Sequence, residues 1–182
     1  MNLVARAKGL LVQPKDEWRA VAAEPADTAS LYTSYIIPLS AIPAVTGFIA
    51  VAIIGAGVVT MGSLLVSSIL SYILGLVGVF VLAKIVEFLA PKFGAPQDGG
   101  AAFKLAAYAP TASWVAGIGL LIPFIGWLIA LAGALYSIYL FYVGGPIVAR
   151  VPPERMVPFT IAVFIVAIIV QLVIGLIIAA VI

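Results

Sequence analysis

Long apolar runs recur through the chain, and each is long enough to cross the hydrocarbon core of a membrane. A core of about 30 Å needs about 20 consecutive apolar residues in a helix. Only 9% of the 182 residues are charged and 65% are hydrophobic, with a mean hydropathy of +1.29. Soluble domains carry about 25% charged residues. The sequence therefore predicts a membrane protein, and backbone hydrogen bonding in lipid favours helices.

The apolar runs predict an all-α, polytopic membrane helical bundle of about five transmembrane helices. The third and fourth spans are separated at Pro123, because together they have about twice the length that a bilayer requires. Pro110 lies inside the third span and is expected to kink it. The spans are expected at Tyr32–Gly55, Met61–Ala90, Phe103–Ile122, after Pro123 to near Val148, and at Val157–Ile182.

Residues 1–30 form a polar segment before the transmembrane domain, which we expect over residues 31–182. Apolar residues in the segment recur at helical spacing, which predicts short amphipathic helices. We expect these helices to lie on the cytoplasmic membrane surface, with Trp18 at the headgroup level and the basic Arg6 and Lys8 near the lipid headgroups.

The charges follow a one-sided pattern. All nine basic residues fall on the N-terminal side of the membrane if the chain crosses it as predicted, and the seven acidic residues lie on the same side. The positive-inside rule then places the N-terminus in the cytoplasm and the C-terminus outside. The start of the chain lacks the unbroken apolar core of a signal peptide, so we expect a multi-pass protein of the cell inner membrane.

Several stretches resemble the Yip1 domain family, in particular its bacterial branch. They are LLVQPKDEWRAVAAE near the start, YIIPLSAIPAV in the first span, FKLAAYAPTASWVAGI in the third, and YSIYLFYVGGPIVARVPPERMVPFTIAV near the end. The resemblance implies five membrane helices, a cytosolic N-terminus and a short extracytoplasmic C-terminus. Eukaryotic members are associated with vesicle trafficking and bind Rab-type GTPases, but the chain does not show their long N-terminal region, so we do not extend that role to it.

Lys84 and Glu87 are three residues apart near the cytoplasmic end of the second span. At this spacing they are neighbours on a helix and predict an intramembrane polar pair. In the other interpretation, both side chains reach the headgroups independently. The sequence leaves both interpretations open.

Small residues recur every four positions on the same span and form one stripe. Such stripes let two helices approach closely, so we predict helix packing, with a polar path for a solute as the alternative. The stripe consists of Ser63, Ser67, Ser71 and Gly75.

Three further polar side chains lie within the later spans. A tyrosine hydroxyl or an amide at membrane depth needs a partner. Interhelical hydrogen bonds are therefore expected for Tyr108, Tyr136 and Gln171.

The chain contains no Cys and no His, which removes thiolate metal sites and histidine-dependent relays. No nucleotide-binding or hydrolase motif is present, so we expect no enzyme, cofactor, metal site or nucleic-acid partner. The sequence predicts a scaffold or interaction protein that contacts the lipid bilayer and membrane or cytoplasmic proteins, with a homo-oligomer left open. The alternative is a small channel or transporter for an ion or small solute.

Overall fold

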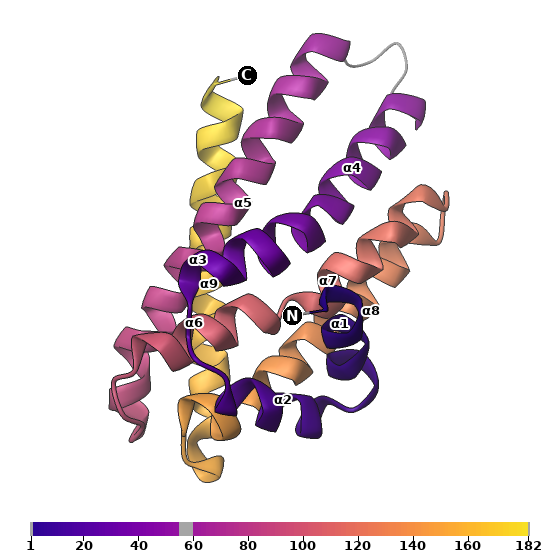
Figure 1. Cartoon of the computed structure of the whole chain (residues 1–182). Coiled ribbons are helices and arrows are strands. Elements are labelled where there is room, and N and C mark those ends of the chain that lie inside the picture. Colours follow the sequence, from indigo (N-terminus) through magenta and orange to yellow (C-terminus); the bar gives the residue numbers. More distant parts are fainter. Residues whose placement is uncertain (1, 55–59, 182) are drawn as a thin grey trace.

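The chain folds into helices and turns over residues 2–54 and 60–181, which the computed structural model describes. Figure 1 shows the long helices α4, α5 and α9 extending toward one end of the molecule, whereas α1, α2 and α6 lie in its other half. The predicted all-α fold class, a membrane helical bundle with short helices at its N-terminus, is confirmed.

The N-terminal segment forms α1 (Leu3–Val12) and α2 (Pro14–Ala23). Helix α1 begins after Asn2, whose side chain accepts a hydrogen bond from the N–H of Ala5 at 3.1 Å. This bond satisfies one of the free donors at the helix start. Helix α2 begins at Pro14, because a proline in the first turn has no N–H that needs a partner.

The next two long helices form a hairpin. Helix α3 (Thr28–Leu31) continues through a π-helical turn (Tyr32–Ile36) into α4 (Ile37–Ile54), and α5 (Met61–Leu89) runs back and ends in a 3-10 turn (Ala90–Phe93). Gly55, the expected end of the first span, lies outside the described residues.

The third predicted span is divided into shorter helices. They are α6 (Gly99–Tyr108), α7 (Thr111–Ala116) and a 3-10 helix (Gly117–Leu121). Pro110 separates α6 from α7, because proline cannot donate the backbone hydrogen bond that would continue the helix. The break falls where the sequence predicts a kink, but it leaves no continuous helix over Phe103–Ile122.

The last two long helices are uninterrupted along most of their length. Helix α8 (Gly126–Gly144) continues into a π-helical turn (Gly145–Ala149), and a 3-10 turn (Pro153–Arg155) leads into α9 (Met156–Val181). Helix α9 packs against α5 and α8.

Four stretches of the described chain are long and apolar enough to cross a membrane. They are Thr28–Ile53, Met61–Phe93, Gly126–Ala149 and Pro153–Val173. The broken segment α6–α7 is the remaining one of the predicted spans. The structure therefore has four complete candidate spans and a fifth segment made of short helices.

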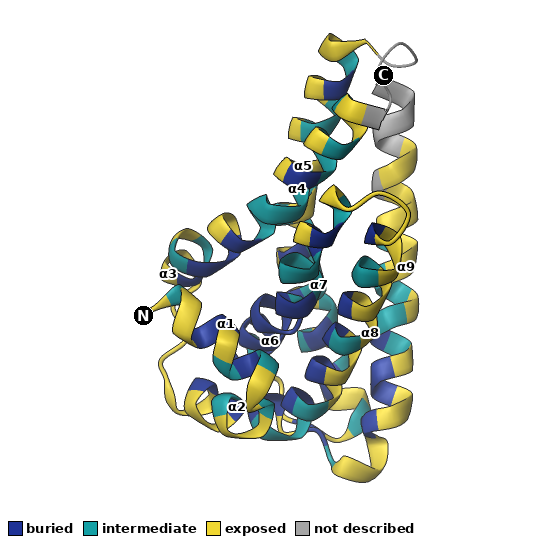
Figure 2. Cartoon of the chain, turned by 90° about the vertical axis from the view of Figure 1, so that its right-hand side faces the viewer, coloured by how far each residue is buried: buried dark blue, intermediate teal, exposed yellow. Residues whose placement is uncertain are grey.

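Burial is concentrated at the end of the bundle that carries α1, α2 and α6. Figure 2 shows dark blue residues gathered on α6 and on the helix faces around it, whereas the far parts of α4, α5 and α9 carry many exposed positions. Every residue from Ala101 to Tyr108 in α6 is buried. Large apolar side chains exposed along the outer faces include Ile69, Ile165 and Ile168, as expected where lipid is the solvent.

Candidate functional site

A buried arginine joins the two N-terminal helices to each other and to the rest of the bundle. Arg6 of α1 is only 7% exposed, and its guanidinium donates to Glu17 at 2.5 Å and to Glu24 at the end of α2. The same guanidinium lies 5.6 Å from the centre of the Tyr108 ring on α6. A guanidinium can pair with carboxylates and stack on an aromatic face at once. Arg6 thus joins α1, α2 and α6.

A buried lysine on α6 closes the end of α2. The Lys104 ammonium donates to the carbonyl oxygen of Val21 at 2.9 Å and also to that of Glu24. The last carbonyls of a helix have no intrahelical partner, and a cation there is favoured by the helix dipole. We name Arg6, Glu17, Glu24 and Lys104 the buried polar cluster.

Trp18 completes the attachment of α2. It is fully buried, its ring meets that of Tyr108 edge-on at 6.2 Å, and its indole fills the space beside Gly144 on α8. Tyr35 also packs against Tyr108, with ring centres 4.7 Å apart, and its hydroxyl is 2.7 Å from that of Thr111. Aromatic side chains of α2, of α6 and of the π-helical turn before α4 therefore meet in one core.

The structure corrects the expected positions of Trp18 and Arg6. Both were expected at the membrane surface, but both are buried within the protein. The apolar face of α1 and α2 packs on the bundle, because Gly144 leaves room for the indole and Tyr108 offers a ring to the guanidinium. Lys8 is exposed, so its membrane-surface role stays a prediction.

A hollow of about 560 Å³ adjoins the buried polar cluster. Its walls include three carboxylates, from Glu17, Glu24 and Asp27, and the hydroxyls of Ser30 and Ser34. Both guanidinium NH2 groups of Arg6 are already bonded to two of these carboxylates. The hollow is therefore polar and predominantly acidic. Within the described residues, no group of three or more acidic side chains is arranged to hold a metal ion.

Another ion pair, between Arg150 and Asp98, lies at the same end of the bundle. Arg150, which follows α8, donates to Asp98 at 2.8 Å, and Asp98 also accepts from the N–H of Ala101 at 3.0 Å. The hydrogen bond from Ala101 holds the pKa of Asp98 below its ordinary value, and the Arg150 charge acts in the same direction. The Asp98 carboxylate thus caps the N-terminus of α6 and connects this helix to the residue that follows the end of α8.

Lys84 and Glu87 contact each other. The Lys84 ammonium donates to the Glu87 carboxylate at 2.8 Å, with the side chains 59% and 22% exposed. Glu87 also lies against Gly99 at the start of α6. The functional role of the pair stays a prediction.

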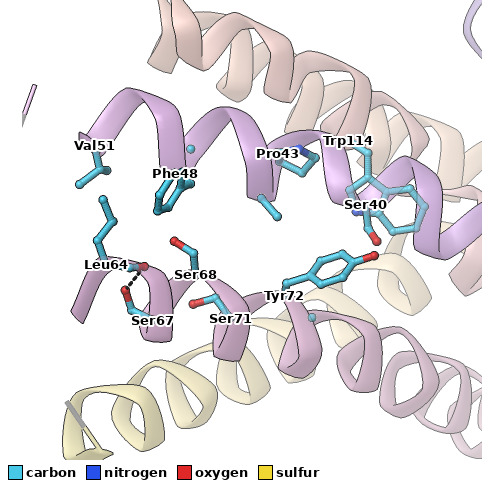
Figure 3. A pocket seen from close by; sticks show the side chains of 13 residues that line it. Ser40, Pro43, Phe48, Val51, Leu64, Ser67, Ser68, Ser71, Tyr72 and Trp114 are labelled. Carbon is cyan, nitrogen blue, oxygen red and sulfur yellow. Dashed lines mark hydrogen bonds between the residues drawn. The ribbon is translucent and has the colours of Figure 1, made fainter. Parts of the chain in front are cut away.

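The small-residue stripe lines a cleft between α4 and α5 (Figure 3). The cleft has a volume of about 580 Å³, and the stripe contributes Ser67, Ser71 and Gly75. A side chain at Gly75 would meet no atom within 4 Å, so the stripe does not bring two backbones together at this point. Ser63 lies at the start of α5, where its hydroxyl donates to the carbonyl of Thr60 at 3.0 Å.

The other two predicted polar positions differ in their surroundings. The Tyr136 hydroxyl on α8 donates to the carbonyl of Leu11 on α1 at 2.8 Å. Gln171 is exposed and lines a small cavity with Pro110 and Trp114. Its interhelical hydrogen bond stays a prediction.

Sequence reasoning missed Lys104, Glu24 and Tyr35 as members of this site. A signal for Lys104 was present, because it is the one charge in the alanine-rich run AAFKLAAYA. A short helix that is apolar on all sides is normally buried, so a lysine within it must find oxygen partners.

Comparison with known proteins gives one match. The model of the family described as Yip1 domain matches residues 8–175, which is most of the chain. No curated protein and no solved structure matches.

Proposed function

Because the chain belongs to the Yip1 domain family, we propose that this multi-pass membrane protein is a non-enzymatic scaffold or interaction protein. In this proposal it resides in a bacterial inner membrane and binds protein partners through its charged, cytoplasmic end. Its membrane helices associate it with the lipid bilayer. The partner face is the hollow beside the buried polar cluster.

The observation that carries the proposal is that this hollow has fixed walls. Arg6 and Lys104 hold α1 and α2 on the bundle from inside, through charge-assisted hydrogen bonds. A surface that is already ordered loses less conformational entropy when a partner binds. The carboxylates of Glu24 and Asp27 then offer a complementary surface to a basic segment of a partner.

The charge distribution supports a cytoplasmic location for this face. Basic residues from three separate parts of the chain lie at the same end, including Arg6, Lys104 and Arg150. The positive-inside rule assigns such an end to the cytoplasm. A reporter active only in the periplasm, fused after Ile182, should therefore be active, and a reporter active only in the cytoplasm should be inactive.

Site-specific crosslinking tests the partner face. A photoreactive residue at Ser30, on the wall of the hollow, should give a discrete protein adduct in native membranes. The same residue at Met61, exposed at the far end of α5, is the matched control and should not. Asp27→Asn keeps a helix cap for α3 but removes a charge, and it should weaken the adduct. Equal adducts from both positions would contradict the proposal.

The alternative function, a small channel or transporter, needs Lys84, Glu87 and the serine stripe to form one path. Lys84 lies thirteen positions after Ser71 on α5, which is about 20 Å along the helix, and it does not line the cleft. The geometry therefore supports the alternative less well. Solute passage into liposomes that disappears with Glu87→Gln would nevertheless favour transport over the interaction role.

A further inference from the structure

The cleft between α4 and α5 has the shape and lining of a site for a hydrocarbon chain. Along α4 it extends from Ser40 to Val51, and along α5 from Leu64 to Gly75. Each stretch is about 16 Å long at the rise of an α-helix. The cleft is thus elongated, and none of its lining residues is charged.

Hydrogen bonds close the cleft at one end, and small side chains leave it open farther along. At one end, the Tyr72 hydroxyl donates to the carbonyl of Ile37 and the Tyr32 hydroxyl to that of Leu76, both at 2.8 Å. Farther along, Figure 3 shows the Phe48 side chain of α4 across from Ser68 of α5, whereas Trp114 of α7 lies beside Ser40. Small side chains predominate on both walls and leave space between the helices; they are Ser40, Ala44 and Gly47 on α4 and Ser67, Ser68 and Ser71 on α5.

The cleft also has access from the side. A second cavity of about 230 Å³ on the same hairpin shares Ala44, Phe48, Ser68 and Tyr72 with it, and its remaining walls include Leu65 and Ile69. Leu65 and Ile69 are exposed on the outer surface of α5. Because both helices are candidate membrane spans, the medium around these residues is lipid hydrocarbon.

We propose that the α4–α5 cleft accommodates one acyl chain of a membrane lipid. An empty cavity of this size would forfeit dispersion contacts along its whole lining. The lining is mainly apolar, and the hydroxyls of Ser40, Ser67 and Tyr72 already donate to backbone carbonyls. Cavities of predominantly apolar lining take up apolar guests, and acyl chains are the apolar molecules that surround these spans. The absence of charge from the lining disfavours an ion or a charged headgroup as the occupant. The inference is independent of the partner face at the other end of the bundle.

Tryptophan fluorescence in vesicles tests the site directly, because Trp114 lines the cleft. The protein is reconstituted in phosphatidylcholine with brominated acyl chains, which quench tryptophan on contact. Trp127 is exposed on α8 and is removed by Trp127→Phe. The buried Trp18 stays as an unquenched reference, and its emission is measured in a Trp114→Phe, Trp127→Phe variant. We expect loss of most of the Trp114 emission.

Two matched substitutions assign the quenching to the cleft. Ser68→Phe places a ring in the space that Figure 3 shows between the helices, and it should restore Trp114 emission. Ala167→Phe fills a different cavity, which α5 and α9 form next to Trp114, and should leave the quenching unchanged. Ser71→Leu replaces Ser68→Phe if thermal unfolding shows that the latter does not fold.

The remaining outcomes overturn the proposal. Quenching of Trp114 by aqueous iodide with no quenching by brominated lipid means that water fills the cleft. Protection from both quenchers means that the two helices close on each other. Quenching by brominated lipid that Ala167→Phe abolishes, and that Ser68→Phe leaves intact, places the acyl chain outside the cleft.

Discussion

The two helical hairpins of this protein use small residues in opposite ways. In the α4–α5 hairpin the small residues line an open cleft, and side chains at Gly62 or Gly75 would meet no atom within 4 Å. In the hairpin of α7 and α8, a Cβ at Gly133 would lie 2.3 Å from that of Ala116, and one at Gly126 would lie 2.6 Å from the carbonyl oxygen of Gly119. One hairpin is open and the other is closed.

The difference shows that small residues permit close packing without causing it. Lipid gives two apolar helices little hydrophobic reason to associate, so contact depends on how well the surfaces fit. In the closed hairpin glycines face alanine or backbone on the opposite helix, as Gly133 does with Ala112 and Ala116. In the open hairpin the serines of α5 line the cleft together with Phe48 of α4 and with Trp114, which comes from α7. The residues that lie across from the small side chains decide the outcome.

The N-terminal helices also distinguish the two hairpins. They attach to the closed one, through Trp18 against Gly144 and through the hydrogen bond from Tyr136 to Leu11. Helix α1 packs against α7, and α2 against α8 and the turn that follows it. We therefore expect the closed hairpin and the N-terminal segment to be the stable part of the molecule, and the α4–α5 cleft to be its adaptable part.

The largest expected effect is that of adding a methyl group inside the closed hairpin. Gly133→Ala places a Cβ 2.8 Å from the carbonyl oxygen of Ala112 as well as against Ala116. Overpacking of this kind costs about 1–3 kcal/mol, and we expect the upper part of that range because backbone atoms cannot move aside easily. Thermal and denaturant unfolding in detergent measure the change.

The matched control is Gly75→Ala in the open hairpin. The new methyl group meets no atom, and alanine is favoured over glycine in a helix by up to about 1 kcal/mol. The variant should therefore be as stable as the parent or more stable. If Gly133→Ala and Gly75→Ala lost the same stability, the α4–α5 cleft would be closed in the membrane, and the contrast between the two hairpins would be wrong.

The second prediction concerns Arg6, which holds α1 and α2 together and against α6. Arg6→Ala removes the buried cation between Glu17 and Glu24. Breaking a buried ion pair costs about 3–5 kcal/mol, but Glu24 is partly exposed, so we expect about 1–2 kcal/mol after discounting for solvent. Arg19→Ala is the control, because the Arg19–Asp16 pair is 70% and 72% exposed and should contribute about 0.5 kcal/mol or less.

Detachment can be measured separately from stability. The chain has no cysteine, so a single cysteine at the buried Val21 reports access to a maleimide reagent without background. Labelling should be slow in the parent and fast with Arg6→Ala, and unchanged with Arg19→Ala. Slow labelling in all three would mean that the apolar contacts of Trp18 hold α2 without the arginine.

Much of this comparison could not have been predicted from the sequence. The apolar runs, the proline at the start of α2 and the kink at Pro110 follow from local rules, and the structure contains all three. The burial of Trp18 does not follow, because an amphipathic pattern identifies an apolar face but not whether lipid or protein covers it. The cleft was missed for the same kind of reason, since the stripe on α5 does not specify the rings that α4 and α7 contribute to the lining.

The third prediction concerns Lys84 and Glu87 at the base of α5. Their ion pair lies within one helix, with Lys84 59% and Glu87 22% exposed, so it should not hold either hairpin together. Pairs at this spacing contribute about 0.2–0.5 kcal/mol. Unfolding of Glu87→Gln, Lys84→Met and the double variant should give a coupling energy in this range. A larger coupling would mean that the pair is buried in the membrane and would return it to the list of functional candidates.

The smallest effect is expected at Asp98, which ties the start of α6 to the residue after α8. The N–H of Ala101 and the charge of Arg150 lower the pKa of Asp98 in the folded protein. A carboxyl group with a depressed folded pKa stabilises the fold above its unfolded pKa of about 3.9, and this contribution disappears as the pH falls through the folded value. Asp98→Asn keeps a capping side chain for α6 but removes the charge. The parent should therefore have the higher unfolding temperature at neutral pH, and the difference should vanish at the acidic end of a titration from pH 7. A difference that stays constant across the titration would show that the Arg150 pair contributes nothing and that hydrogen bonding alone joins the base of the closed hairpin.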